Sequence, residues 1–322
     1  MTPSATPEPS PAPVLVLMAT LNGGPALQEQ LDSLSSQQHT HWRLHVSDDG
    51  STDGTLDTVA AFAKAQAAHG RDVAITSGPG RGFVANFLGL LAGVRDDPAF
   101  VALCDQDDVW LPDRLQRGVE ALSKGPADQP GLYCSRSWVV DQDLQNPRIS
   151  AAFPRPATFG NALVQNIAPG NTILLNAAAA QLARAAVSAA QAVPGLPAHD
   201  WWLYQLVTGA GGLVIWDPEP TLRYRQHRSN QIGANKGFGA TTRRFSAMLA
   251  GRSRSWTDAN LAALRGAAHL LSPESATLLE AFDRARRGTL WVRLTAPSKL
   301  GIYRNGTLAQ AALLLSLALR RL

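Results

Sequence analysis

The chain has 322 residues, of which 45% are hydrophobic and 17% charged, so it can build a sizeable core as one large domain or two moderate ones. Its two cysteines exclude a disulfide framework and are typical of buried thiols in a reducing compartment. No apolar run reaches the ~20 residues of a membrane span, and we expect a cytoplasmic protein with a net charge of +4.

The first half of the chain alternates short apolar runs with segments of helical periodicity. The apolar runs predict buried strands at residues 14–19, 42–46, 73–76 and 100–104. The periodic segments predict helices at residues 26–37, 56–68 and 83–94. Strands and helices that alternate at this spacing form βαβ units, so we expect an α/β fold whose central sheet is mostly parallel and flanked by helices.

The second half has a less regular pattern. Strands are predicted at residues 132–140, 172–175 and 212–216, and helices at 161–166, 177–192 and 199–208. From residue 241 onward the pattern is helical and basic residues accumulate, which indicates an anionic partner, either a membrane surface or nucleic acid. The expected organisation is a disordered leader at 1–13, an α/β domain at 14–240 and a helical C-terminal region at 241–322.

Three carboxylates, Asp105, Asp107 and Asp108, follow the fourth predicted strand. Gln106 separates the first two, so their side chains share one face if strand geometry continues. Carboxylates on one face repel each other unless a cation lies between them, and Mg²⁺ or Mn²⁺ prefers such oxygen ligands. The stretch therefore predicts a metal–diphosphate site at the carboxyl end of a strand, where open α/β sheets bind ligands. The alternative is an acidic loop that caps a helix starting near Pro112.

A second acidic pair, Asp48 and Asp49, lies where the second predicted strand gives way to a helix. A carboxylate at this place can accept the N–H of a uracil or thymine ring, or a ribose hydroxyl. The alternative is helix capping by Ser51, Thr52 or Asp53. Capping accounts for one such residue but not for the aspartates that precede them, so the pair is a candidate for nucleotide binding.

The segment Gly78–Gly82 contains three glycines and resembles a loop that binds phosphate. It is not the dinucleotide fingerprint, because Phe83 stands where the third glycine of that motif belongs, and it lacks the Gly-Lys-Ser/Thr ending of a P-loop. The alternative is a flexible turn before a helix. Arg81 in this segment is a candidate contact for a diphosphate.

Histidines mark two further candidate sites. His199 and Asp200 open a predicted helix, where a carboxylate is stabilised and can act as a general base on a hydroxyl. The alternative there is an N-cap aspartate beside a surface histidine. In the basic segment after the last strand, His227 can complete a metal shell and Arg225 can neutralise a diphosphate. The alternative there is a solvated basic loop.

The C-terminal segment 307–322 is strongly apolar and ends in Arg320 and Arg321 before the last leucine. It is too short to span a bilayer. It therefore predicts either an interfacial helix, with the arginines on anionic lipid, or a helix packed on the body of the protein or on a second subunit.

The order of these motifs resembles the family 2 glycosyltransferases with the glycosyltransferase A fold, and within them the bacterial rhamnosyltransferase-like branch. The resemblance covers about residues 14–235. The matching segments are Val16–Asn22, Ser47–Gly54, Asp105–Trp110, Gly170–Thr172, His199–Asp200 and Tyr224–His227. Their combination is specific, although each motif alone is not.

The resemblance implies roles for individual residues. It implies that Asp49 holds the nucleobase and that Asp200 is the catalytic base, although His199 departs from the glutamate that is commoner before that base. It implies that Mg²⁺ or Mn²⁺ is held on the sugar diphosphate by Asp107, which lies closest to the metal, together with Asp105 and His227. The implied donor-binding residues are Thr20, Asn22, Asp49, Arg81, Asp105, Gln106 and Arg225.

The resemblance also implies an activity, an inverting transfer of single sugars, because the Gln-Arg-Trp signature of processive polymerases is absent. The implied donor is a dTDP- or UDP-sugar, with dTDP-L-rhamnose favoured, and the implied acceptor is a bacterial surface glycan, free or lipid-linked. We expect no nucleic-acid partner, and membrane contact only at the periphery through the C-terminus. The alternatives are a nucleotide-sugar-binding protein without activity and a sugar nucleotidyltransferase, whose basic glycine-rich loop is missing from Met18–Pro25.

Overall fold

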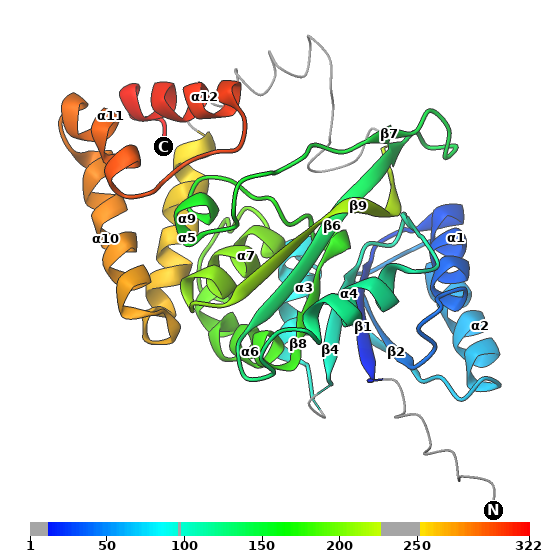
Figure 1. Ribbon diagram of the computed structural model, residues 1–322. Coiled ribbons are helices and arrows are strands. Elements are labelled where there is room, and N and C mark those ends of the chain that lie inside the picture. The colour runs from blue at the N-terminus through cyan, green and yellow to red at the C-terminus, as the bar shows by residue number, and fades with distance from the viewer. Residues whose placement is uncertain (1–11, 96–97, 227–251) are drawn as a thin grey trace, which may run out of the picture.

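The computed structural model describes residues 12–95, 98–226 and 252–322. A central sheet carries helices on both faces, and the C-terminal helices stand together at the end of the molecule farthest from the first two helices (Figure 1). The strands are β1 (Val14–Thr20), β2 (Trp42–Asp48), β3 (Val73–Ser77), β4 (Phe100–Cys104), β5 (Val109–Trp110), β6 (Gly131–Val140), β7 (Arg148–Ile149), β8 (Leu174–Asn176) and β9 (Leu213–Arg225). The helices are α1 (Gly24–Ser35), α2 (Thr55–Ala67), α3 (Phe83–Ala92), α4 (Arg114–Leu122), α5 (Phe159–Ala162), η1 (Gly170–Thr172), α6 (Ala177–Gln191), α7 (His199–Gly209), α9 (Arg252–Gly266), η2 (Ala268–Leu270), α10 (Pro273–Arg287), α11 (Leu290–Lys299) and α12 (Thr307–Ala318).

The strands follow the order β3-β2-β1-β4-β8-β6-β9-β5, and β7 pairs with the outer part of β6. The pairings among β3, β2, β1 and β4 are parallel, as the βαβ pattern predicts, and β6 is parallel to β9. The other four pairings are antiparallel. The predicted α/β class is therefore confirmed, but the sheet is mixed rather than mostly parallel, because the second half of the chain adds its strands in both directions.

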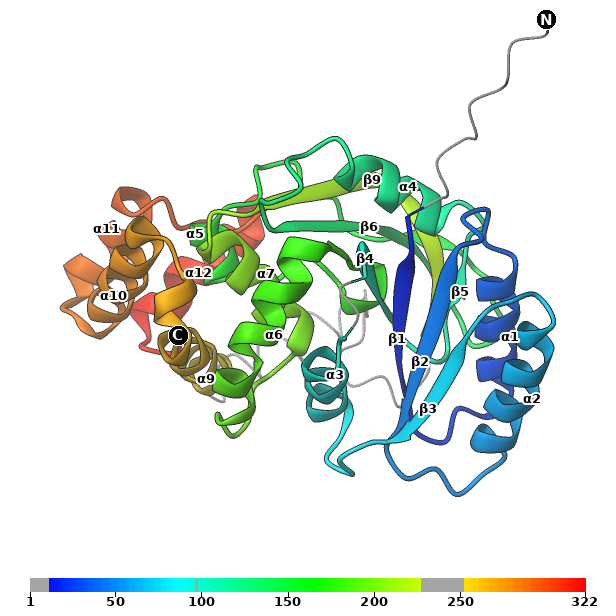
Figure 2. The same ribbon diagram turned by 90° about the horizontal axis from the view of Figure 1, so that it is seen from below.

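β1 lies between two hydrophobic cores, which is why its sequence is a continuous apolar run. Val14, Val16 and Met18 pack on the face that α1, α2 and α4 cover. Leu15 and Leu17 point to the opposite face and pack with α3, α6 and α7. Figure 2 shows α1 and α2 on one side of the strands and α3 and α6 on the other. Successive residues of a strand face opposite sides of the sheet. When helices cover both sides, every position of the strand is buried and favours an apolar residue.

β9 is longer than the sequence predicts. A strand was expected at 212–216, with a polar basic segment after it, whereas β9 runs for 13 residues and ends at Arg225. Pro218 and Pro220 lie inside it, where proline normally ends pairing because it donates no hydrogen bond. The ladder with β6 accommodates them through register shifts near Arg136. As a result Arg225 lies on the sheet rather than in a loop.

The C-terminal region is helical, as predicted, from α9 to α12. Within the part of the chain that the structure describes, no helix is long and apolar enough to cross a membrane. The predicted leader at 1–13 falls almost wholly outside the described residues, and so does the predicted boundary at residue 240. Both stay predictions.

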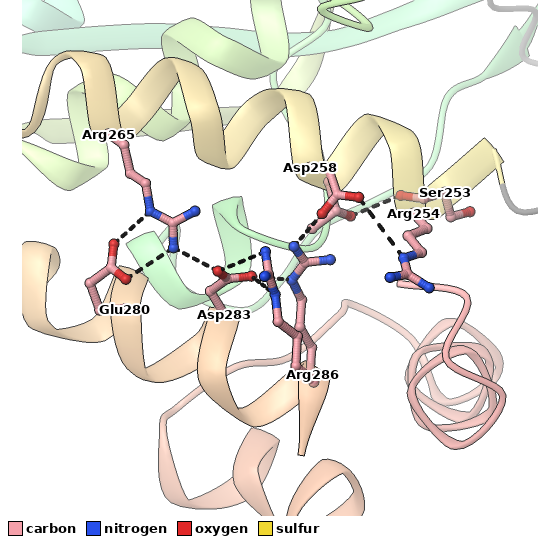
Figure 3. Close-up of polar contacts among 9 residues, drawn as sticks. Ser253, Arg254, Asp258, Arg265, Glu280, Asp283 and Arg286 are labelled. Carbon is pink, nitrogen blue, oxygen red and sulfur yellow. Dashed lines mark hydrogen bonds and ion pairs between the residues drawn. The ribbon is translucent and has the colours of Figure 1, made fainter. Parts of the chain in front are cut away.

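A network of ion pairs joins α9 to α10 (Figure 3). Arg286 of α10 is almost fully buried, donates to Asp283 at 2.6 Å and also pairs with Asp258 of α9. Asp283 in turn accepts from Arg265 of α9 at 2.7 Å. Glu280 pairs with Arg265 as well, but at the exposed rim. The buried carboxylate is therefore the shared partner that holds the two helices together.

Replacing Asp283 with alanine should lower the free energy of unfolding by roughly 3–5 kcal/mol, because the buried Arg286 guanidinium then keeps only the exposed Asp258 as an ion-pair partner among the described residues. Replacing Glu280 with alanine removes the other partner of Arg265, but the Glu280 side chain is 52% exposed, so the loss should stay below about 1 kcal/mol. Urea denaturation of the whole chain measures both. Equal, small losses would show that the network does not hold α9 against α10.

Candidate active site

The carboxyl ends of β1, β2 and β4 meet at one edge of the sheet. In the parallel register Thr20 lies opposite Asp48, and Met18 lies opposite Cys104. The loops that follow these strands therefore leave the sheet side by side. They bring the first acidic pair and the later acidic stretch to one place, although more than fifty positions separate the two in the sequence.

Asp48 is an internal anchor of this edge. Its carboxylate accepts the hydroxyls of Thr20 at 2.8 Å and Ser51 at 2.6 Å, as well as the Ser51 N–H at 2.8 Å. Burial acts to raise the pKa of Asp48, but these hydrogen bonds outweigh it and the pKa lies below its usual value. Thr20, a predicted donor contact, is thus buried and paired with Asp48, and its role toward a donor stays a prediction.

Asp49 organises the glycine-rich segment. Its two carboxylate oxygens accept the N–H groups of Gly80 at 2.6 Å and Gly82 at 2.7 Å. A β-carbon on Gly78 would lie 2.8 Å from Asp49 Oδ1, so only glycine allows this approach. The flexible-turn alternative therefore does not describe this segment, and the exposed Arg81 is held next to the predicted nucleobase residue.

Asn22 and Gln106 connect the loops of the site. Asn22 Oδ1 accepts the Thr52 N–H at 2.9 Å, and the Asn22 N–H donates to Ser51 Oγ at 2.8 Å. The Gln106 amide accepts the Leu21 N–H at 2.9 Å and donates to the Leu21 carbonyl at 3.0 Å. Both predicted donor residues therefore lie at the site and fix its walls, while their contact with a donor stays a prediction.

The three aspartates after β4 have different surroundings. Asp105 and Asp107 are half-buried, whereas Asp108 is fully buried and points inward. Burial and the charges of Asp107 and Asp200 raise the pKa of Asp105 to about 7. Helix capping does not account for these residues, because α4 begins only at Arg114. The raised pKa of Asp105 indicates that the negative charges of neighbouring carboxylates outweigh the positive charge of nearby Arg114.

The crowded pair fits a hard divalent cation. Mg²⁺ is commonly held by one or two protein carboxylates while substrate phosphates complete its shell, so two carboxylates match this chemistry. The role of Asp105 and Asp107 as metal ligands stays a prediction. No group of three or more histidine, cysteine or acidic side chains with metal-binding geometry occurs among the described residues. His227, the third predicted ligand, lies outside the described residues and stays a prediction.

Asp200 is the second residue of α7 and lies close enough to Asp105 to influence its pKa. Its carboxylate accepts the N–H of Gly170 at 3.0 Å and the N–H of Trp201 at 2.6 Å. Burial raises the pKa of Asp200 to about 6, against the lowering effect of these hydrogen bonds. The N-cap position belongs to Ala198, so Asp200 is not the capping residue of the alternative interpretation. A carboxylate with this pKa is suited to take a proton near neutral pH.

His199 is buried rather than on the surface. Its ring stacks on Phe87 with a centroid distance of 4.1 Å, and Phe83 meets it edge-on. Burial lowers the pKa of His199 to about 3, so the ring is neutral. Neither ring nitrogen has a hydrogen-bond partner among the residues that the structure describes. The packed ring fixes the start of α7 and hence the position of Asp200 beside it.

Arg225 at the end of β9 is buried and contacts the acidic loop from behind. Its Nε donates to the Asp107 carbonyl at 2.9 Å, and its other nitrogens donate to the Gln142 carbonyl and to the Glu29 carboxylate. The structure therefore brings this predicted diphosphate contact to the acidic loop that is predicted to bind the metal. These three partners are groups of the protein itself, and contact of Arg225 with a diphosphate stays a prediction.

Two residues that the sequence left without a role join the halves of the site. Arg114 is buried with its guanidinium 3.6 Å from the centre of the Trp110 ring, and it donates to the carbonyls of Leu103 and Asn171. Asn171 donates from its amide to Asp108 at 2.6 Å. These contacts tie the turn that holds Asp200 to the end of β4. In the sequence, the only sign of the contact between Arg114 and Trp110 is their separation by four positions. That separation is too common to predict a contact, and here Trp110 lies on β5 and Arg114 on α4.

Comparisons with known proteins agree with this arrangement. The chain is 27% identical to the dTDP-rhamnosyl transferase RfbG of Shigella flexneri over 232 residues, which is 71% of this chain and 78% of the relative. Residues 1–349 of TarS from S. aureus superpose with a TM-score of 0.52 at 14% identity, covering 96% of this chain and 90% of that structure. The same protein in complex with UDP-GlcNAc gives a TM-score of 0.51 at 15% identity, covering 90% and 92%. These structures share the glycosyltransferase A fold with this chain.

The match to a family model covers the strands and loops that build this edge of the sheet. It extends over residues 15–178, just over half of the chain, and includes β1 to β8 with both acidic motifs. The predicted family resemblance is thereby confirmed: the chain belongs to glycosyl transferase family 2 and is a glycosyltransferase.

Proposed function

We propose that the protein transfers a single sugar from a nucleotide diphosphate to a hydroxyl of a bacterial surface glycan, with inversion of the anomeric carbon. The observation that carries this proposal is Asp200, whose pKa of about 6 and place beside Asp105 suit a base next to a metal–diphosphate site. Family membership favours this activity over that of a sugar nucleotidyltransferase or a binding protein without turnover.

The donor is a dTDP- or UDP-sugar, and dTDP-L-rhamnose is the first candidate. Its support is the similarity to a relative that is named a dTDP-rhamnosyl transferase. Asp49 receives the base, with the glycine-rich segment that its carboxylate organises as the wall beside it. The exposed Arg81 of that segment is available to the phosphates.

Asp105 and Asp107 are the residues that would hold Mg²⁺ or Mn²⁺. When bound, the cation would supply positive charge against the departing nucleoside diphosphate. The chain itself contributes the fixed orientation of the acidic loop, which the Nε of Arg225 holds by its bond to the Asp107 carbonyl at 2.9 Å. A loop anchored in this way need not rearrange when charge develops on the leaving group.

Asp200 acts on the acceptor. It takes the proton of the acceptor hydroxyl while that oxygen forms a bond to the anomeric carbon and the bond from that carbon to the diphosphate oxygen breaks. A single displacement of this kind inverts the carbon. The N–H groups of Gly170 and Trp201 keep the carboxylate in place and favour its ionised form. The acceptor is a growing surface glycan at the cytoplasmic side of the cell envelope.

Calorimetry of dTDP and UDP binding with and without Mn²⁺ tests the donor site. We expect metal-dependent binding of one of them, and a loss of at least about tenfold in affinity for Asp107→Ala, because a charged ligand to metal and phosphate is removed. Asp113→Ala is the matched control: that carboxylate lies in the same stretch but pairs with Arg117 at 3.7 Å. An affinity of Asp107→Ala equal to that of the control would contradict the metal role. Release of free nucleoside diphosphate only when acceptor is added separates a transferase from a binder.

A further inference from the structure

Large apolar side chains are exposed mainly on the last two helices. Of the thirteen large hydrophobic residues that are exposed in the described parts of the chain, seven lie between residues 290 and 319. Trp291 at the start of α11 is 75% exposed, and Leu308 at the start of α12 is 86% exposed. The other five are Leu290, Val292, Leu294, Leu315 and Leu319. Clustering of this kind on one part of a surface marks an interaction site.

The exposed apolar side chains lie on two helices, α11 and α12, that are fastened to each other. Along α12 and its C-cap residue Leu319, the exposed residues Leu308, Leu315 and Leu319 recur at helical spacing, while Leu313 and Leu317 are buried. Arg293 of α11 is buried and donates to the carbonyls at positions 317 and 318, at 2.7 and 2.9 Å. α11 is thus fastened to the end of α12, and both helices stand at the same end of the molecule (Figure 1).

Charge identifies the partner. From residue 288 to the end of the chain there is no aspartate or glutamate, whereas Lys299, Arg320 and Arg321 are exposed. An apolar helix face bordered by positive charge, with tryptophan in it, suits the boundary between headgroups and acyl chains of an anionic bilayer. A second copy of this chain would bring equal positive charge against the same surface, and like charges repel.

We propose that α11 and α12 form a peripheral docking surface for anionic membranes. Trp291 and Leu308 enter the headgroup boundary, and Lys299, Arg320 and Arg321 meet the lipid phosphates. This surface does not depend on the identity of the sugar or on the metal.

The docking surface connects to the acceptor side of the active site, and this link alone rests on the proposed function. Arg304, between α11 and α12, donates to the Val164 carbonyl at 2.7 Å, and Asn161 of α5 donates to the Tyr303 carbonyl at 2.9 Å. The ring N–H of Trp201 donates to Ala162 in the same segment at 2.7 Å. The docking surface is therefore joined through α5 to the start of α7, which carries the proposed base Asp200.

Vesicle flotation of the full chain tests the proposal. We expect binding to vesicles of phosphatidylcholine with 30% phosphatidylglycerol, weaker binding to phosphatidylcholine alone, and weakening by salt, as screening requires. Trp291→Gln with Leu308→Gln should reduce binding at least about tenfold. Leu56→Gln with Trp138→Gln is the matched control, because these side chains are exposed at 42% and 37% elsewhere on the surface.

Two results would overturn the proposal: equal binding of the two double variants, or no binding of the unaltered chain to anionic vesicles. A dimer in sedimentation that the Trp291 and Leu308 changes dissolve would assign the surface to a second copy instead. Arg320→Gln with Arg321→Gln should remove the preference for anionic lipid, and an unchanged preference would count against the lipid contact. Donor binding without vesicles is measured on the same variants, so failure of the docking surface remains distinct from failure of the transferase site.

Discussion

Replacing Asp200 with asparagine is expected to lower kcat for sugar transfer about a thousandfold, within the range that general bases contribute. Asparagine has nearly the same shape, so α7 and the ring of His199 keep their packing. It offers one acceptor oxygen instead of two, so it can serve only one of the N–H groups of Gly170 and Trp201. The donor site should be unaffected, and calorimetric affinity for the nucleotide should therefore match that of the unaltered chain. Wild-type turnover in this variant would mean that another group takes the proton.

The pH profile gives an independent check on the same residue. A carboxylate base works in its ionised form, so transfer should fall about tenfold per pH unit below the pKa of about 6 and level off above it. His199 does not contribute to the profile, because its pKa of about 3 keeps it neutral throughout. Asp105, with a pKa of about 7, titrates nearby, and measurement at saturating donor and metal keeps it ionised. The step should disappear in Asp200→Asn.

Local pattern carries most of the information for the strands of the first half. The runs that form β1 and β4 are apolar throughout because helices cover both faces of the sheet, and this demand is visible residue by residue. β9 escapes the same reasoning because Pro218 and Pro220 normally end a strand, and only the neighbouring β6 shows how the ladder absorbs them. Which strands pair, and in which direction, depends on the whole fold. The mixed direction of the outer strands therefore cannot be predicted from the sequence of any single strand.

The candidate site shows the same division. The acidic motifs are visible in the sequence, so the place of Asp49 and Asp105 at strand ends and of Asp200 at the start of a helix could be predicted. The contact of Asp49 with Gly80 and Gly82 could not, because it joins segments that meet only once the strands are in register. Burial likewise comes from the whole fold: the sequence predicts Arg225 either as a diphosphate contact or as part of a solvated basic loop, and the structure places it only 6% exposed, behind the acidic loop.

The second large effect is expected at the contact between Asp108 and Asn171. Asp108 is fully buried and accepts the Asn171 amide at 2.6 Å and the Arg225 N–H at 3.2 Å. Burial and the charges of Asp107 and Asp105 raise its pKa well above the usual value. Asn171 precedes the strand β8 and follows Gly170, whose N–H holds Asp200. The pair therefore fixes the turn at Gly170, which holds Asp200, against the acidic loop.

Replacing Asn171 with aspartate should lower the free energy of unfolding by roughly 3–5 kcal/mol, because it removes the amide donor to Asp108 and adds a second buried acidic group beside a carboxyl whose pKa is already raised by burial. Replacing Asp108 with asparagine should cost less than about 1.5 kcal/mol, since the Asn171 amide can turn its oxygen toward the new donor. Urea denaturation of the whole chain measures the two losses, and kcat should fall with Asn171→Asp because the turn that holds Gly170 is displaced.

The double variant Asp108→Asn with Asn171→Asp separates this contact from a general loss of packing. The new asparagine donates its amide to the new aspartate and accepts the Arg225 N–H through its oxygen, so the hydrogen bonds return in reversed sense. We expect most of the stability and kcat lost in Asn171→Asp to be regained, with a coupling energy of about 2 kcal/mol or more. If the double variant is no more stable than Asn171→Asp alone, the contact does not hold the two loops together. The packing of Arg114 on Trp110 then remains as the structural link between the acidic loop and the turn that holds Asp200.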